Sequence, residues 1–237
     1  MTEAEWLHEV ETDFPREMLS TLDKQFDPRS VKTTKKKRER KLRLFGCAAC
    51  RRIAHLFTTP EQQRLIEVVE EYADGDTNRH AVTRSRETAG KAVPQYKSHE
   101  EWSSIYGAYD YSQRALNLLT WLTVSDVIEG VVEDIVGATV NDPENPEEEH
   151  VHQKALLLDI FGNPFRPISF APEWRSDTAV SLARGMYESR DFSAIPILAD
   201  ALQDAGCDND DVLNHCRDAR LVHVRGCWVV DWVLKKS

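Results

Sequence analysis

The sequence of 237 residues has few glycines, and these are widely spaced. It contains ten, and the closest pair, Gly130 and Gly137, is seven positions apart. Dinucleotide-binding fingerprints, P-loops, the nucleophile elbow of α/β-hydrolases and GxxxG membrane-dimer motifs all place glycines about five or fewer positions apart. The sequence therefore contains none of these motifs, and it gives no support to the functions that depend on them.

Long apolar runs are also missing, and cysteine is scarce. No apolar stretch approaches the ~20 residues that a membrane-spanning helix needs. The segment from Met1 to Trp6 is acidic and lacks the basic start and apolar stretch of a secretory signal. The five cysteines are an odd number, and a chain of this length does not need disulfides to fold. We therefore expect a reduced, cytoplasmic protein without a membrane partner.

Charge is abundant but unevenly distributed along the chain. The formal net charge is −10, yet the window from Lys32 to Arg52 holds ten basic residues and one acidic residue, so it carries +9 and the rest of the chain −19. The basic strip from Lys32 to Arg43 could hold phosphate groups, but no nucleic-acid-binding module and no interleaved aromatic residues accompany it. We therefore favour a solvated segment ahead of a core helix, and we expect a protein partner rather than nucleic acid.

Helix signals dominate the sequence and predict an all-α fold. Capping signatures begin several segments, and Gly75, Gly162 and Gly206 stand where helices are expected to end. The longest periodic pattern lies within 110–140, where apolar residues recur every three or four positions. The run from Trp228 to Leu234 fits a final core helix, although its β-branched residues would also suit a strand.

We predict one helical domain over residues 1–237, arranged as a compact multi-helix orthogonal bundle. The segment 141–147 contains two prolines and cannot continue a helix. It is therefore the predicted internal boundary or flexible loop, which would divide the bundle into two lobes.

Several strings of the sequence are distinctive. They are TEAEW at 2–6, RLFGCAACRR at 43–52, DIFGNPFRP at 159–167, ILADALQDAGCDN at 197–209 and HVRGCW at 223–228. Together they resemble a family of uncharacterised planctomycete proteins, over both ends of the chain and only weakly between 77 and 109. The resemblance implies no activity and assigns no site residue.

Cysteine and histidine gather in two places that could together supply a metal site. Cys47 and Cys50 lie three positions apart on a predicted helix, where two thiolates can share a metal ion. Further ligands are available in the last 31 residues, namely Cys207, His215, Cys216, His223 and Cys227. Because Cys47 and Cys50 sit in an apolar stripe, we favour packing as small hydrophobic side chains, with a zinc site as the alternative.

Two further patterns have a weaker chemical interpretation. Glu5 with His8 and Glu149 with His152 have the Glu-x-x-His spacing of di-metal helix bundles, but we expect both pairs to be solvated. The C-terminal third also concentrates polar residues near irregular turns, namely Arg166, Asp208, His215, His223, Arg225 and Asp231. We expect these side chains mainly to satisfy loop and helix-end groups.

Three functions remain open from the sequence. The leading prediction is a non-enzymatic interaction or adaptor protein, because motifs of catalysis are missing and amphipathic helices are many. The second is a zinc-stabilised helical protein that uses the cysteine and histidine residues above. The third is a hydrolase built on Asp208, His215 and His223 in the C-terminal third.

Overall fold

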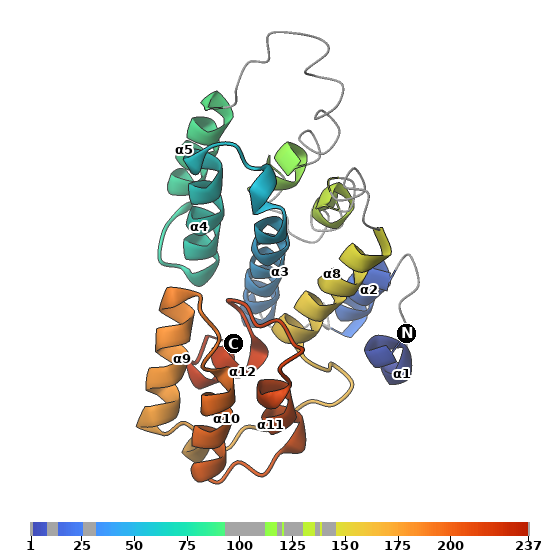
Figure 1. The fold of residues 1–237 in the computed structure, drawn as a ribbon, viewed down its shortest axis with the longest axis vertical. Helices are drawn as coiled ribbons and strands as arrows, with labels where there is room; N and C mark the ends of the chain where they lie inside the picture. Colours follow the sequence, from blue (N-terminus) through green and yellow to red (C-terminus); the bar gives the residue numbers. More distant parts are fainter. Residues whose placement is uncertain are drawn as a thin grey trace. The chain divides into compact units, whose positions relative to one another are not determined.

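The computed structural model describes residues 2–8, 14–25, 32–92, 112–117, 120, 130–135, 138 and 146–236. Every regular element in these ranges is a helix, which confirms the all-α class (Figure 1). The chain divides into two compact units, an N-terminal unit of residues 1–154 and a C-terminal unit of residues 155–237. The predicted loop at 141–147 lies mostly outside the described residues, and its last two residues belong to a helix. The boundary there stays a prediction.

The described residues of the N-terminal unit form a series of helices. They are α1 (Glu3–His8), α2 (Phe14–Gln25), α3 (Lys32–Arg52), the 3₁₀ turn η1 (Ala54–Leu56), α4 (Pro60–Asp74), α5 (Arg79–Lys91) and the first part of α8 (Pro146–Phe161). The long helix predicted within 110–140 falls largely outside the described residues, and its described pieces at 112–117 and 130–135 are helical.

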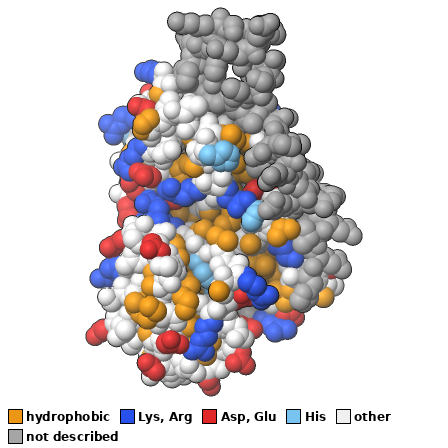
Figure 2. Space-filling view, in the orientation of Figure 1, with side chains coloured by type: hydrophobic (Ala, Val, Ile, Leu, Met, Phe, Trp, Pro, Cys, Tyr) orange, Lys and Arg blue, Asp and Glu red, His pale blue; other side chains and the backbone are white. Residues whose placement is uncertain are grey.

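Helix α3 changes character along its length. Its residues from 42 to 50 are all buried, whereas Lys35, Lys36 and Lys37 are exposed. Arg43, the last residue of the predicted basic strip, is instead buried, with its guanidinium 5.1 Å from the centre of the Tyr72 ring. Figure 2 shows basic and acidic side chains interspersed over the coloured part of the visible face. Among the exposed lysines, Lys35 lies 3.9 Å from the Glu39 carboxylate, so this stretch does not present basic charge alone.

Ion pairs reach into the core of the N-terminal unit. Arg51 and Glu70 form two hydrogen bonds of 2.8 and 3.1 Å. Arg52 donates to both carboxylate oxygens of Glu149, which is only 4% exposed. The expectation that Glu149 is solvated is therefore wrong, because the sequence does not reveal that a distant arginine neutralises it. The side chain of His8 lies outside the described set.

The C-terminal unit packs short helices around one apolar core. Beyond the end of α8 it contains the 3₁₀ turn η2 (Pro172–Trp174), α9 (Asp177–Ser189), α10 (Ile195–Asp204), α11 (Asp210–Arg217) and α12 (Trp228–Val233). The run from Trp228 is thus a helix and not a strand. Ser176 and Asn209 cap α9 and α11 by accepting hydrogen bonds from backbone N–H groups in the first turn. No helix among the described residues is long and apolar enough to cross a membrane.

An aromatic cluster closes one side of this core. The ring of Phe170 stacks on Trp232 with centroids 4.0 Å apart, and it also lies near Trp174 and Trp228. Aromatic pairs of this kind contribute about 0.5–1.5 kcal/mol each beyond the area they bury. The cluster anchors α12, whose first residue, Trp228, follows directly after a cysteine of the candidate site.

Candidate metal centre

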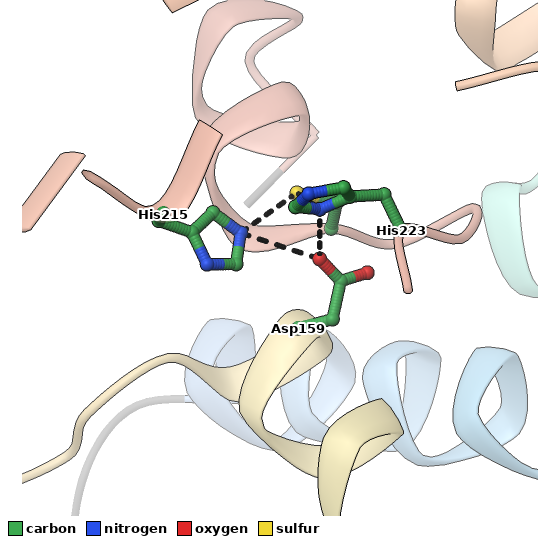
Figure 3. A group of neighbouring side chains, drawn as sticks. Asp159, His215 and His223 are labelled. Carbon is green, nitrogen blue, oxygen red and sulfur yellow. Dashed lines mark hydrogen bonds and ion pairs between the residues drawn. The ribbon is translucent and has the colours of Figure 1, made fainter. Parts of the chain in front are cut away.

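Four side chains of the C-terminal unit converge on one point. Asp159 lies in the last turn of α8, His215 in the last turn of α11, His223 in the following loop and Cys227 just before α12. Their ligand atoms all lie within 4.8 Å of one another, and Figure 3 shows the two imidazole rings turned toward the Asp159 carboxylate. Four separate segments thus meet through side chains that bind metal ions.

The distances between these atoms are close to those around a tetrahedral zinc ion. From Asp159 Oδ1, His223 Nδ1 lies at 2.8 Å and His215 Nε2 at 3.2 Å. From Cys227 Sγ, the same nitrogen of His215 lies at 3.4 Å and that of His223 at 4.0 Å. Zinc bond lengths and tetrahedral angles require about 3.4 Å between nitrogen and oxygen ligands and about 3.6 Å between nitrogen and sulfur. Small side-chain shifts would therefore suffice to accommodate zinc.

The way the imidazole rings face the site separates a metal site from a proton relay. A nucleophile–histidine–acid relay uses both ring nitrogens, one toward the nucleophile and the other toward the acid. Here His215 turns Nε2 toward both Cys227 and Asp159, and His223 turns Nδ1 toward both. Each ring thus presents one nitrogen to a shared centre, which is the arrangement of a ligand.

Asp159 is held as a buried anion. Its second oxygen, Oδ2, accepts a hydrogen bond of 2.9 Å from the backbone N–H of Val224, so Oδ1 is the oxygen that faces the centre. Burial on its own raises the pKa of Asp159, but hydrogen bonds from His215 and His223 outweigh it and lower the pKa overall. A carboxylate that is 2% exposed and ionised needs a positive partner.

Cys227 is a protonated thiol in the absence of a cation. Burial raises the pKa of its thiol well above the ordinary value, and the nearby charges of Asp159 and Cys216 raise it further. A divalent metal ion reverses this balance, because its charge stabilises the thiolate that coordinates it. A thiolate at Cys227 would therefore require a cation beside it.

A tight turn fixes the spacing of two of the ligands. The N–H of Cys227 donates to the carbonyl of Val224 at 2.9 Å, and Gly226 has a φ of +102° within this turn. Such a φ favours glycine, because a side chain there would meet the backbone. The turn carries His223 before it and Cys227 at its end, so a five-residue segment supplies two ligands and the N–H that holds Asp159.

Trp228 forms a wall of the site. Its ring lies 5.0 Å from the His215 ring, and it also covers Gly162, three residues after Asp159. A Cβ on Gly162 would lie 3.3 Å from two ring atoms of Trp228. The glycine therefore lets the end of α8 approach α12 closely enough for Asp159 to reach the other three side chains.

The site is enclosed by protein. The side chains of His215 and His223 are only 10% and 5% exposed, and Cys227 is fully buried. The second nitrogen of His223, Nε2, is buried without a hydrogen-bond partner among the described residues. Nδ1, which faces the centre, is thus the engaged nitrogen of that ring.

Of the seven metal-ligand candidates from the sequence, three lie in this group. His215, His223 and Cys227 belong to it, whereas Cys207 and Cys216 are buried in the core of the same unit and are not members of the group. Burial raises the pKa of Cys216 to about 12, and nearby Asp159 and Cys207 also raise it. Cys207 and Cys216 are therefore small apolar core residues.

Cys47 and Cys50 lie on α3 in the N-terminal unit, and both are fully buried. The Cys47 thiol donates to the carbonyl of Ile66 on α4 at 3.9 Å. Burial raises the pKa of both thiols. Cys47 and Cys50 therefore have the properties of small hydrophobic side chains packed in the core.

Asp159 is the member of the group that the sequence does not predict. It begins the distinctive string DIFGNPFRP, but an aspartate near the end of an apolar helix has no local metal signature. The aspartate proposed for a hydrolase, Asp208, is exposed, and it is not part of the group. The useful signal was a carboxylate on the buried face of a helix, where an ionised side chain needs a partner.

Comparison with known proteins adds no functional assignment. No protein-family model, no curated protein and no solved structure matches this chain. Its function is therefore inferred from the chemistry of its own residues.

Proposed function

We propose that this protein is a zinc-stabilised helical protein that binds one structural Zn²⁺ in its C-terminal unit. The ligands are Asp159 Oδ1, His215 Nε2, His223 Nδ1 and Cys227 Sγ. The observation that carries the proposal is the convergence of these four atoms within 4.8 Å, with each imidazole turning a single nitrogen toward both the carboxylate and the thiol.

The donor set favours zinc over the other common biological cations. One thiolate, two imidazoles and one carboxylate combine soft, intermediate and hard donors, which suits Zn²⁺ and its spectroscopic substitute Co²⁺. Mg²⁺ and Ca²⁺ prefer six or more oxygen ligands, and the site faces them with a single carboxylate oxygen. We therefore expect Zn²⁺ and Co²⁺ to bind in preference to Mg²⁺ and Ca²⁺.

The enclosure of the site favours a structural role over a catalytic one. Catalytic zinc ions keep a position for water or substrate beside three protein ligands, whereas structural ones have four protein ligands. Here four protein side chains are available, and their exposure does not exceed 10%. The zinc would tie the end of α8 to the end of α11 and to the turn before α12.

Zinc would add to the stability that the apolar core gives the C-terminal unit. Structural zinc binding contributes about 10–16 kcal/mol in zinc-finger peptides near neutral pH, but those peptides are unfolded without metal. This unit also has a buried core and the aromatic cluster on α12. Zinc would fasten the end of α11 and the turn before α12, so its removal is expected to loosen these parts before the rest of the unit.

Metal analysis of purified protein tests the proposal. The full chain, expressed with zinc in the medium and dialysed, is expected to retain about one zinc per chain. Cys227→Ser should lose most of it, whereas Cys207→Ala, which removes a buried thiol outside the group, should keep it. Reconstitution with Co²⁺ should give a sulfur-to-cobalt charge-transfer band that Cys227→Ser abolishes.

Two results would overturn the proposal. One is zinc far below one per chain even after reconstitution of the folded protein. The other is a cobalt charge-transfer band that survives in Cys227→Ser and disappears in Cys207→Ala, because the thiolate ligand would then be a different cysteine.

A further inference from the structure

We infer that Tyr187 is a positioning residue for the metal centre: through Arg225 it holds the turn that carries His223 and Cys227 in its ligating conformation. This inference rests on the proposed zinc site. It concerns a residue on α9 that is not one of the four proposed ligands and that belongs to the buried core of the unit.

Arg225 is the side chain through which the turn reaches α9. It lies two residues after His223 and two before Cys227, next to Gly226 with its positive φ. Its guanidinium carbon stands 4.6 Å from the centre of the Tyr187 ring, within the range of a cation–π interaction. Because Arg225 lies inside the turn, a fixed Arg225 limits how far the two flanking ligands can move apart.

Tyr187 is a firm support for this contact. It is 3% exposed and belongs to the apolar core of the unit, so its ring cannot follow a mobile loop. Desolvation strengthens a cation–π interaction, because water no longer competes for the cation. The contact therefore favours one conformation of the turn before metal binds, which lowers the ordering cost of ligation.

Lys236 offers a matched comparison on the same ring. Its ammonium nitrogen lies 4.7 Å from the centre of the Tyr187 ring, a distance similar to that of Arg225. Lys236 follows α12 and lies nine residues after the last ligand, so it does not belong to the ligand turn. Loss of Lys236 should change the environment of Tyr187 without releasing His223 or Cys227.

The test measures the zinc dissociation constant of the full chain by competition with a chelating dye. Arg225→Met and Tyr187→Leu are each expected to weaken zinc binding by about 2- to 30-fold, which corresponds to the loss of one cation–π interaction. Tyr187→Phe keeps the aromatic face and should therefore bind zinc more tightly than Tyr187→Leu does. Lys236→Met should bind zinc as wild type does, even if its melting temperature falls.

The double variant Tyr187→Leu/Arg225→Met distinguishes positioning from general destabilisation. If Arg225 acts through Tyr187, the double variant binds zinc no more weakly than the weaker single variant. The cobalt spectra of Arg225→Met and Lys236→Met provide a second measure, since only the former should show an altered ligand geometry. Arg225→Met is a half-buried loop substitution and keeps the test valid if Tyr187→Leu does not fold.

The inference is wrong if Arg225→Met and Lys236→Met weaken zinc binding equally, or if the effects of Tyr187→Leu and Arg225→Met multiply. It is also wrong if Arg225→Met binds zinc as tightly as wild type. These results leave the zinc site itself intact. Failure of wild-type protein to bind zinc would instead refute the proposed function, and the role of Tyr187 would fall with it.

Discussion

Replacement of Gly162 by alanine should destabilise the C-terminal unit by about 2–5 kcal/mol. The glycine ends α8 with a φ of +70°, a conformation that costs an L-residue about 1–2 kcal/mol. The added Cβ would also lie 3.3–3.4 Å from three ring atoms of Trp228. Overpacking of this kind costs about 1–3 kcal/mol more, because either Trp228 or the end of α8 must shift.

Gly206 provides the control that separates these two costs. It has a φ of +89° at the end of α10, and a Cβ there would meet no atom within 4 Å. Gly206→Ala should therefore incur only the conformational cost of about 1–2 kcal/mol. Gly185 lies within α9 and also has open space around its Cβ position, so Gly185→Ala should stabilise the unit by about 0.5–1 kcal/mol.

Urea unfolding followed by tryptophan fluorescence, in the presence of a chelator, measures these free energies without a contribution from metal binding. The free energy of unfolding is expected to be highest in Gly185→Ala, then to decrease through wild type and Gly206→Ala, and to be lowest in Gly162→Ala. If Gly162→Ala costs no more than Gly206→Ala, the Trp228 ring does not press on the end of α8. The account of how Asp159 is brought to the site would then fail.

Three further predictions concern charge and thiols. The pKa of Asp159 is lower in the folded protein than the ordinary aspartate value of about 3.9, so its ionised carboxylate stabilises the metal-free fold at pH values above about 3.9. This stability should be lost as the pH falls through the lower pKa of the folded state. Melting temperatures between pH 5 and 2 should therefore fall more steeply in wild type than in Asp159→Asn; parallel curves would contradict this. Arg52→Met leaves the Glu149 carboxylate buried without its partner and should cost on the order of 3 kcal/mol, whereas loss of the exposed pair of Arg64 should cost less than about 1 kcal/mol in the same urea assay. All five cysteines are buried and free, so iodoacetamide should modify them in guanidinium chloride and leave them unmodified in the native state; rapid modification of native Cys216, with its pKa of about 12, would show that the core opens readily.

Local signals predicted the helices well, because the physics that ends and caps a helix is local. Gly75, Gly162 and Gly206 all have positive φ at helix ends, as the sequence predicts. At the start of α4 the Gln62 side chain accepts a hydrogen bond of 3.0 Å from the backbone N–H of Thr59, as the predicted capping signature requires of that position. These features depend on residues within one turn of each other, so a single sequence contains the information.

The metal centre could be predicted only in part, because its members are brought together by tertiary packing. His223 and Cys227 lie four residues apart and invite attention as a pair. Asp159 lies 64 residues before His223, and only the packing of α8 brings the two together. Tertiary packing also explains why the burial of Glu149 could not be predicted, since the arginine that neutralises it is 97 residues away. In both cases the partner of a buried carboxylate can be identified only from the folded structure.

Charge balance gives a physical reason for zinc at this point of the core. With Zn²⁺ bound, the carboxylate of Asp159 and the thiolate of Cys227 offset both positive charges, and the two neutral imidazoles leave the centre with no net charge. Without metal, Asp159 is a buried carboxylate that depends on its hydrogen bonds with His215 and His223, and the neighbouring Cys227 thiol is protonated. Buried net charge is costly, whereas a neutral four-ligand centre is not. Zinc would therefore stabilise the unit in two ways, by bonding to four segments and by placing a positive charge beside a buried carboxylate.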